Sequence, residues 1–168
     1  MQSVPQKTIF IRNFVFGVED GLVSTVGFLS GIAVADVPEK TIFLTGIILV
    51  FVEAVSMAAG SFLSEDFTED YVSKKEVPLH DPIMAGVIMF LSYFVAGMIP
   101  IIPYIVSPPS TAFITSIVVT LLALLVLGIA TARISKVNVF KNSIRLLIIA
   151  GLAITVGIVV GKAISNLA

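Results

Sequence analysis

The sequence predicts an all-α integral membrane protein with five transmembrane helices in each subunit. The chain has 168 residues, of which 57% are hydrophobic, and its mean hydropathy is +1.09. Only 12% of the residues are charged, which is about half the share found in soluble domains. The apolar residues fall into five runs, and each run is close to the ~20 residues that a helix needs to cross the hydrocarbon core.

The first two spans are joined by a tight turn. After a short interfacial lead, the first span covers about residues 13–35, and the second covers about residues 41–63. Pro38 and its acidic neighbours end one helix and begin the next. Residues 64–81 then form a short acidic segment, which we expect to lie in the cytoplasm as a helical extension followed by a loop.

The remaining three spans are separated by one bend and one basic loop. Asp81 and Pro82 predict the start of the third span, because Asp caps helices and Pro fits their first turn. This span ends near Pro100, where further prolines bend the chain. The fourth and fifth spans cover about residues 111–132 and 146–164, and the segment between them is a predicted basic loop.

The distribution of Lys and Arg predicts the orientation of the chain. Two basic residues flank the spans on one side, and eight flank them on the other. The two are Lys40 and Lys162; the eight are Lys7, Arg12, Lys74, Lys75, Arg133, Lys136, Lys141 and Arg145. Because basic loops stay in the cytoplasm, we expect a cytoplasmic N-terminus and a C-terminus outside or in a lumen. Residues 1–168 would form a single transmembrane domain.

The composition excludes several classes of protein. Without cysteine the chain has no disulfide, iron–sulfur cluster or cysteine nucleophile, and the lone His80 excludes a multi-histidine metal site within one chain. No nucleophile–base set or phosphate-binding loop is present, so we expect neither an enzyme nor a bound cofactor. A net charge of −1 gives no argument for nucleic-acid binding. Because Trp is absent, an interfacial aromatic belt must come from Tyr71, Tyr93, Tyr104 and the phenylalanines.

Two acidic residues, Glu19 and Asp20, interrupt the first span. Ionisable groups cost at least a few kcal/mol in hydrocarbon, so they usually mark a binding site or a pathway. At about 100° per residue, Asp20 shares one arc of the helix with Ser24, Gly27 and Gly31. The first span therefore has a polar face of small residues that carries a buried acid.

The second span repeats this design, because Glu53, Met57, Gly60 and Ser64 share one arc. On the predicted topology, Met57 lies at a depth similar to that of Asp20, and Glu53 lies one turn closer to the middle of the membrane. Two carboxylates and a thioether suit a borderline divalent ion such as Fe²⁺, since oxygen ligands alone favour harder ions. If the two faces meet, they form a metal pathway.

Each of these residues also has a purely structural interpretation. A methionine in a membrane helix commonly serves packing, small residues at four-residue spacing commonly serve helix contacts, and Glu19 alternatively faces a cytoplasmic vestibule. The acids of the charged segment form either a solvated face or a capture surface that raises the local concentration of cations. These acids are Glu65, Asp66, Glu69 and Asp70.

The two polar faces resemble the signature of a known family. The segments FGVEDGLVSTVGFLSGIA and VEAVSMAAGSFLS resemble the first two helices of the vacuolar iron transporter family. This family includes plant vacuolar iron transporters, a yeast vacuolar iron and manganese carrier and nodulin-21-like proteins. The segments FLSYFVAGMIPIIPYI, LALLVLGIATARI and SIRLLIIAGLAITVGIVVGKAI resemble its later helices, so the resemblance covers nearly the whole chain.

The resemblance implies a homodimer that moves Fe²⁺, and sometimes Mn²⁺, out of the cytosol in exchange for protons. Asp20 matches the acid of the family's first helix, and Met57 matches the methionine of its second helix. Glu53 has no direct match, because members often carry a carboxylate where this chain has Leu49. Many members also insert a cytoplasmic three-helix metal-binding domain between the second and third helices, for which this short form leaves too little chain.

We therefore expect a metal/proton exchanger in which Fe²⁺ comes first and Mn²⁺ second. A carboxylate in a low-dielectric site tends to hold a proton, and metal binding requires its deprotonated form, so the two ions compete. The membrane would be the plasma membrane of a prokaryote or a vacuole-like organelle of a eukaryote. The alternatives are a non-transporting membrane interaction protein and a metal-binding sensor.

A dimer contact is predicted on the first span. The spacing of Gly27 and Gly31 permits close approach between membrane helices. Two copies of Asp20 would then face each other near a two-fold axis. Gly157 and Gly161 in the fifth span present a competing contact surface.

Overall fold

The structure is built from helices and short connections. The computed structural model describes residues 6–35, 37–74 and 78–167. The helices are α1 (Gln6–Ala33), α2 (Glu39–Ser73), α3 (His80–Met98), α4 (Pro103–Val106), α5 (Pro109–Ser135) and α6 (Val139–Ser165). Five helical stretches are long and apolar enough to cross a membrane, and one of them joins α3 and α4. The predicted all-α fold with five spans is confirmed.

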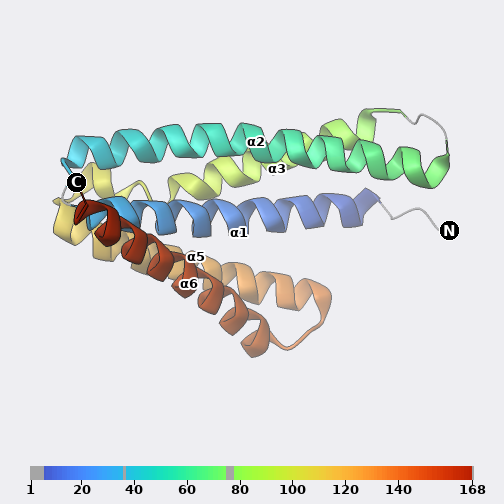
Figure 1. Ribbon diagram of the computed structural model, residues 1–168. Helices are drawn as coiled ribbons and strands as arrows, with labels where there is room; N and C mark the ends of the chain where they lie inside the picture. Colours follow the sequence, from blue (N-terminus) through green and yellow to red (C-terminus); the bar gives the residue numbers. More distant parts are fainter. Residues whose placement is uncertain (1–5, 36, 75–77, 168) are drawn as a thin grey trace.

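Helix α1 lies at the centre of the bundle and packs against α2, α3, α5 and α6. In Figure 1, α2 and α3 lie on one side of α1, and α5 and α6 lie on the other. Two buried apolar clusters, around Leu22 and Leu29 of α1, form the core. The start of α1 shares one end of the bundle with the α2–α3 and α5–α6 connections, whereas α6 ends at the opposite end.

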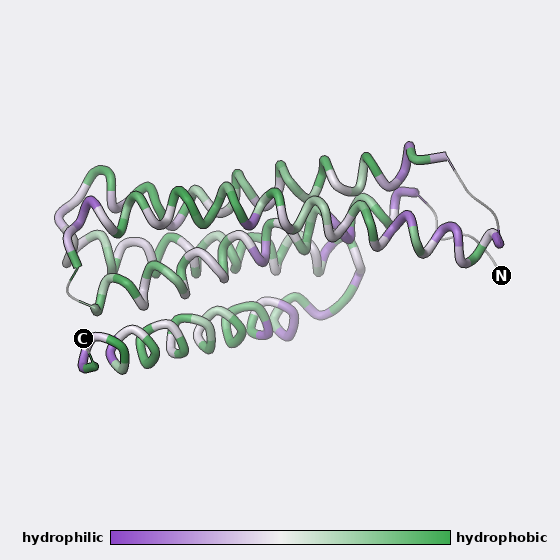
Figure 2. The backbone as a smooth tube through the Cα atoms, turned by 45° about the horizontal axis from the view of Figure 1, so that its top comes forward, coloured by the Kyte–Doolittle hydropathy of each residue, from purple (hydrophilic) through white to green (hydrophobic). Residues whose placement is uncertain are grey.

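Polar residues gather at the end of the bundle where α1 begins, which we call the charged end. Figure 2 shows hydrophilic stretches there and largely hydrophobic colour along the middle of the helices. The described basic residues of the charged end are Lys7, Arg12, Lys74, Arg133, Lys136, Lys141 and Arg145. Lys75 lies outside the described residues. This grouping agrees with the predicted loops, and a cytoplasmic N-terminus stays a prediction.

Two helices reach beyond the membrane at the charged end. Helix α1 begins at Gln6, so the predicted interfacial lead is helical from Gln6 to Arg12. No proline or glycine interrupts these turns, and Ile9 and Asn13 are buried in the bundle. Helix α2 has 35 residues and is therefore about 52 Å long, well beyond the ~30 Å hydrocarbon core. The helical extension predicted after the second span is confirmed.

The prediction of a long basic loop before the last span is wrong. Helices α5 and α6 are separated only by residues 136–138. Lys136 ends α5 in a left-handed conformation with φ 54°. The side chain of Asn138 then caps α6 by accepting a hydrogen bond of 3.0 Å from the backbone N–H of Lys141. With a cap at that point, the basic residues on both sides belong to helices.

Candidate metal pathway

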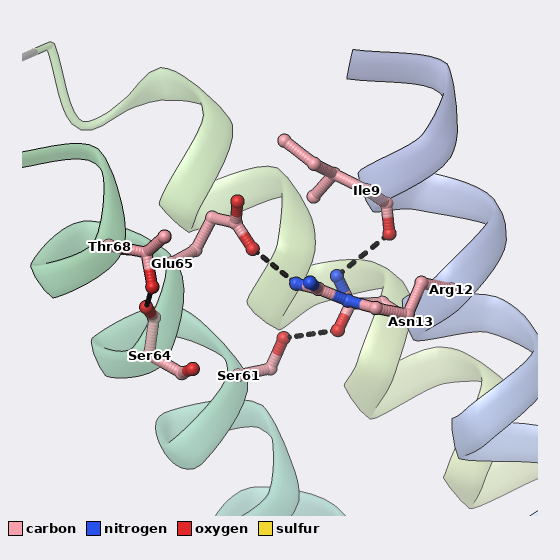
Figure 3. Close-up of polar contacts among 7 residues, drawn as sticks. All are labelled: Ile9, Arg12, Asn13, Ser61, Ser64, Glu65 and Thr68. Atoms are coloured by element: carbon pink, nitrogen blue, oxygen red, sulfur yellow. Dashed lines mark hydrogen bonds and ion pairs between the residues drawn. The ribbon is translucent and has the colours of Figure 1, made fainter. Parts of the chain in front are cut away.

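The facing sides of α1 and α2 carry most of the residues that the sequence singled out. The two helices run antiparallel, and two polar contacts set their register near the charged end. The Ser61 hydroxyl donates a hydrogen bond of 2.7 Å to Oδ1 of Asn13, and the guanidinium of Arg12 pairs with the carboxylate of Glu65. Figure 3 shows these four side chains pointing toward one another across the two helices.

Asp20 and Glu53 lie within electrostatic reach of each other in the membrane-spanning part of the bundle. The register of α1 and α2 places Asp20 opposite the turn that joins Glu53 to Met57. Both carboxylates are half-buried. Two acids from separate helices thus lie near each other where each charge is costly unless it has a partner.

Met57 lines a cavity of about 530 Å³ between α1, α2 and α3. Hydroxyl and amide groups form part of its wall, and Met89 of α3 contributes a second thioether. The other lining residues are Arg12, Asn13, Phe16, Ser56, Gly60, Ser61 and Ser64. Met89 is almost fully buried and was not singled out by the sequence, because nothing in its own helix distinguishes it from packing.

A buried tyrosine of α3 lies near the two acids. The hydroxyl of Tyr93 lies 2.6 Å from Oγ of Ser24, and the Ser24 hydroxyl donates a second bond of 2.6 Å to the backbone carbonyl of Asp20. Because a serine hydroxyl has a single proton, Tyr93 is the donor in the first bond. Tyr93 is fully buried and lies within electrostatic reach of Asp20 and Glu53.

The predicted aromatic belt is therefore wrong for two of its three tyrosines. Tyr93 and Tyr104 are buried, whereas Tyr71 is exposed. A buried phenol needs a hydrogen-bond partner, and for Tyr93 that partner lies inside the bundle. Its place in the middle of the third span, far from either interface, was the signal that could have revealed this role.

Glu19 lies on another side of α1. It lines a separate pocket of about 360 Å³ together with residues of α5. Its charge interacts with that of Asp20 and with that of Arg145 in α6. Since neighbouring residues of a helix point about 100° apart, Glu19 and Asp20 serve different surroundings.

The acids at the end of α2 do not act as one group. Glu65 pairs with Arg12, and its side chain is only 6% exposed. Glu69 instead lies among acids, and those within electrostatic reach are Glu65, Asp66, Asp70 and Asp81. Over the described part of the chain, no group of three or more acidic or histidine side chains is arranged to hold a metal ion. One subunit thus brings few ligands to any single point.

Gly27 and Gly31 pack against α6 of the same subunit. A Cβ at Gly31 would lie 2.7 Å from the carbonyl oxygen of Gly157, and one at Gly161 would lie 2.0 Å from that of Gly31. The two glycine pairs that the sequence presented as competing surfaces therefore meet each other. All four border an apolar groove of about 740 Å³ between α1 and α6. A contact between subunits through Gly27 and Gly31 stays a prediction.

The family follows from sequence similarity along almost the whole bundle. Residues 11–78 and 72–162 match the sequence model of the VIT family. The chain belongs to this family. It is similar to vacuolar iron transporter 1 of Tulipa gesneriana, with 25% identity over 95% of this chain and 89% of the tulip protein. It is also similar to vacuolar iron transporter homolog 1 of Arabidopsis thaliana, with 29% identity over 88% of this chain and 79% of that protein.

This VIT family member lacks residues that some relatives have. The alignment with the tulip protein extends over 219 positions, more than the 168 residues of this chain, so the tulip protein has residues without a counterpart here. The alignment with the Arabidopsis homolog extends over 160 positions. The two stretches that match the family model overlap at residues 72–78, between the last residues of α2 and the start of α3. The short connection between these helices leaves no room for a three-helix domain.

Proposed function

We propose that this VIT family protein transports Fe²⁺, with Mn²⁺ as a second ion, through a site between α1 and α2. One observation carries the proposal: Asp20 of α1 and Glu53 of α2 lie within electrostatic reach of each other in the membrane-spanning part, near a cavity lined by Met57. The carboxylates supply charge for a divalent ion, and the thioether favours borderline ions over Mg²⁺ and Ca²⁺. The names of the relatives, which are vacuolar iron transporters, support iron as the cargo.

The proposed direction is out of the cytosol, in exchange for protons. An acid in a low dielectric tends to hold a proton when no metal is bound, and the metal binds its deprotonated form. Asp20 would then carry the metal in one direction and a proton in the other. The names of the relatives favour a vacuole-like membrane, and in a prokaryote the plasma membrane takes its place.

The proposed transporter is a homodimer. Transition-metal ions commonly take about four to six ligands, and one subunit offers Asp20, Glu53 and Met57. A second copy related by a two-fold axis doubles each ligand. The proposed contact surface is the apolar groove between α1 and α6, which Gly27 and Gly31 border.

Uptake into proteoliposomes, with and without a pH gradient, tests the proposal. Asp20→Asn keeps the shape of the side chain and removes its charge, so uptake of both ions should fall to background. Met57→Leu keeps the volume and removes the sulfur, so Fe²⁺ uptake should fall more than Mn²⁺ uptake. Met98→Leu is the matched control, because Met98 packs against the apolar core, and both rates should stay at the wild-type level.

Four results would contradict parts of the proposal. Undiminished uptake by Asp20→Asn would remove the central ligand, and equal losses for both ions in Met57→Leu would make Met57 a packing residue. A metal-dependent thermal shift of the wild-type protein without uptake would identify a metal sensor. If neither a shift nor uptake occurs, the acids serve contacts with a partner protein.

A further inference from the structure

One face of α2 carries a ladder of residues that leads from the charged end toward Asp20. The ladder residues are spaced four apart, so each lies about 6 Å deeper along the helix than the last. In order of depth they are Glu65, Ser61, Met57 and Glu53. The two inner residues belong to the metal site proposed above. The two outer ones have partners on α1 whose role that site does not explain.

The two outer residues of the ladder are bound to side chains of α1 (Figure 3). Glu65 pairs with Arg12, and the Ser61 hydroxyl bonds to the side chain of Asn13. Nδ2 of Asn13 in turn donates a hydrogen bond of 2.9 Å to the backbone carbonyl of Ile9, which fixes its orientation. Arg12, Asn13 and Ser61 all line the outer part of the 530 Å³ cavity. The two contacts therefore lie on the side of the cavity that is nearer the charged end.

The two members of the ion pair differ sharply in exposure. The side chain of Glu65 is 6% exposed, whereas that of Arg12 is 59% exposed. A buried carboxylate is strongly destabilising when its partner leaves and nothing replaces it. An exposed guanidinium, in contrast, can return to water at little cost, because surface ion pairs are weak.

We propose that Glu65 is the first cation-binding residue of the pathway and that Arg12 is a tethered cation which occupies it at rest. An arriving divalent ion displaces Arg12 toward water, so Glu65 exchanges one cation for another and is never left without a counter-charge. Opening of the Asn13–Ser61 bond then admits the ion to the cavity at Met57. This inference rests on the proposed transport function. It supplies a capture step for a chain without a metal-binding domain between α2 and α3.

Removal of the tethered cation should strengthen capture. In Arg12→Gln the amide can still donate a hydrogen bond to Glu65, but it no longer competes as a cation. The Mn²⁺ concentration that half-saturates uptake should fall at least about fivefold, the lower end of usual coupling between two ligands. Arg12→Lys keeps the charge and is the matched control, with a half-saturating concentration near that of the wild type. Glu65→Gln should raise this concentration.

The double variant Arg12→Gln/Glu65→Gln separates competition from packing. If Arg12 acts only by competing at Glu65, Arg12→Gln has no further effect once Glu65 is neutral. A folded Arg12→Gln protein with an unchanged or raised half-saturating concentration would overturn the inference, and the pair would then be a structural clamp.

A reversible lock tests the same step without changing Arg12 or Glu65. Because the chain has no cysteine, Asn13→Cys combined with Ser61→Cys creates a single thiol pair across the contact. Oxidation to the disulfide should block uptake, and reduction should restore it, while each single cysteine variant should be insensitive to oxidant. Full uptake by completely cross-linked protein would overturn the inference. Failure of the wild type to take up any ion would instead count against the proposed function.

Discussion

Replacing Gly157 with alanine tests the contact between α1 and α6 that holds the helix of Asp20 in place. A Cβ at position 157 would lie 2.0 Å from the carbonyl oxygen of Gly27 and 2.9 Å from its carbonyl carbon, whereas ordinary contacts begin at 3.4 Å. These are backbone atoms, so no side chain can rotate away. The helices must separate by roughly 1 Å, and overpacking of this kind costs about 1–3 kcal/mol.

Gly151→Ala is the matched control on the same helix. A Cβ at position 151 meets nothing within 4 Å. Alanine favours a helix by up to about 1 kcal/mol over glycine, so this variant should be as stable as the wild type or slightly more stable. Gly157→Ala gains the same helix preference, so the free energies of unfolding of the two variants should differ by the overpacking cost alone, about 1–3 kcal/mol. Denaturant titration of the detergent-solubilised protein, followed by circular dichroism, measures this difference.

Equal stabilities of the two variants would refute the reasoning, because the helices would then not be in contact at Gly157. If Gly27 instead contacts a second subunit, Gly157→Ala should leave the protein stable, and Gly27→Ala should convert dimers to monomers. Light scattering after size-exclusion chromatography distinguishes these results.

Three further predictions concern the buried tyrosine, the topology and the dimer. Tyr93→Phe removes the hydroxyl bonded to Ser24 and should lower the free energy of unfolding by about 1 kcal/mol. It should also lower uptake more than Tyr104→Phe, because Tyr104 lies in an apolar cluster. Equal effects of the two variants on uptake would show that Tyr93 has no role in the site. Single cysteines at Lys74 and Leu167 should react with an impermeant reagent from opposite sides of the membrane, and reaction from the same side would contradict five spans. Ser24→Cys, on the wall of the α1–α6 groove, should cross-link two subunits, and cross-links obtained only from α6 would move the interface.

The spans could be predicted from the sequence, but the ends of the helices could not. Hydropathy indicates where lipid begins, and five apolar runs are therefore sufficient to count the spans. Helix ends depend instead on caps and breakers. Asn138 caps α6 within a basic segment, and no breaker lies between Gln6 and the apolar run of α1, so both helices begin well before their apolar runs do.

The candidate site could be predicted only in part. Helical periodicity places Asp20 on one arc and Glu53 with Met57 on another, yet it does not tell whether the two arcs face each other. Tyr93 belongs to a third helix, and its approach depends on how α3 crosses α1. The pairing of Arg12 with a residue of α2 likewise depends on the register of the two helices, and neither helix sequence specifies that register directly.

The two ends of the proposed pathway differ in how their acids are neutralised. At the charged end, Glu65 forms an ion pair with the cationic side chain of Arg12. Deeper in the bundle, Asp20 instead interacts with another acid, Glu53, and two like charges within a membrane need a proton or a metal ion between them. Metal should therefore exchange with the Arg12 side chain at Glu65, and with protons at Asp20 and Glu53. A pH gradient should then change uptake by the same factor in the wild type and in Arg12→Gln. Loss of the gradient effect in that variant would place the proton exchange at the charged end.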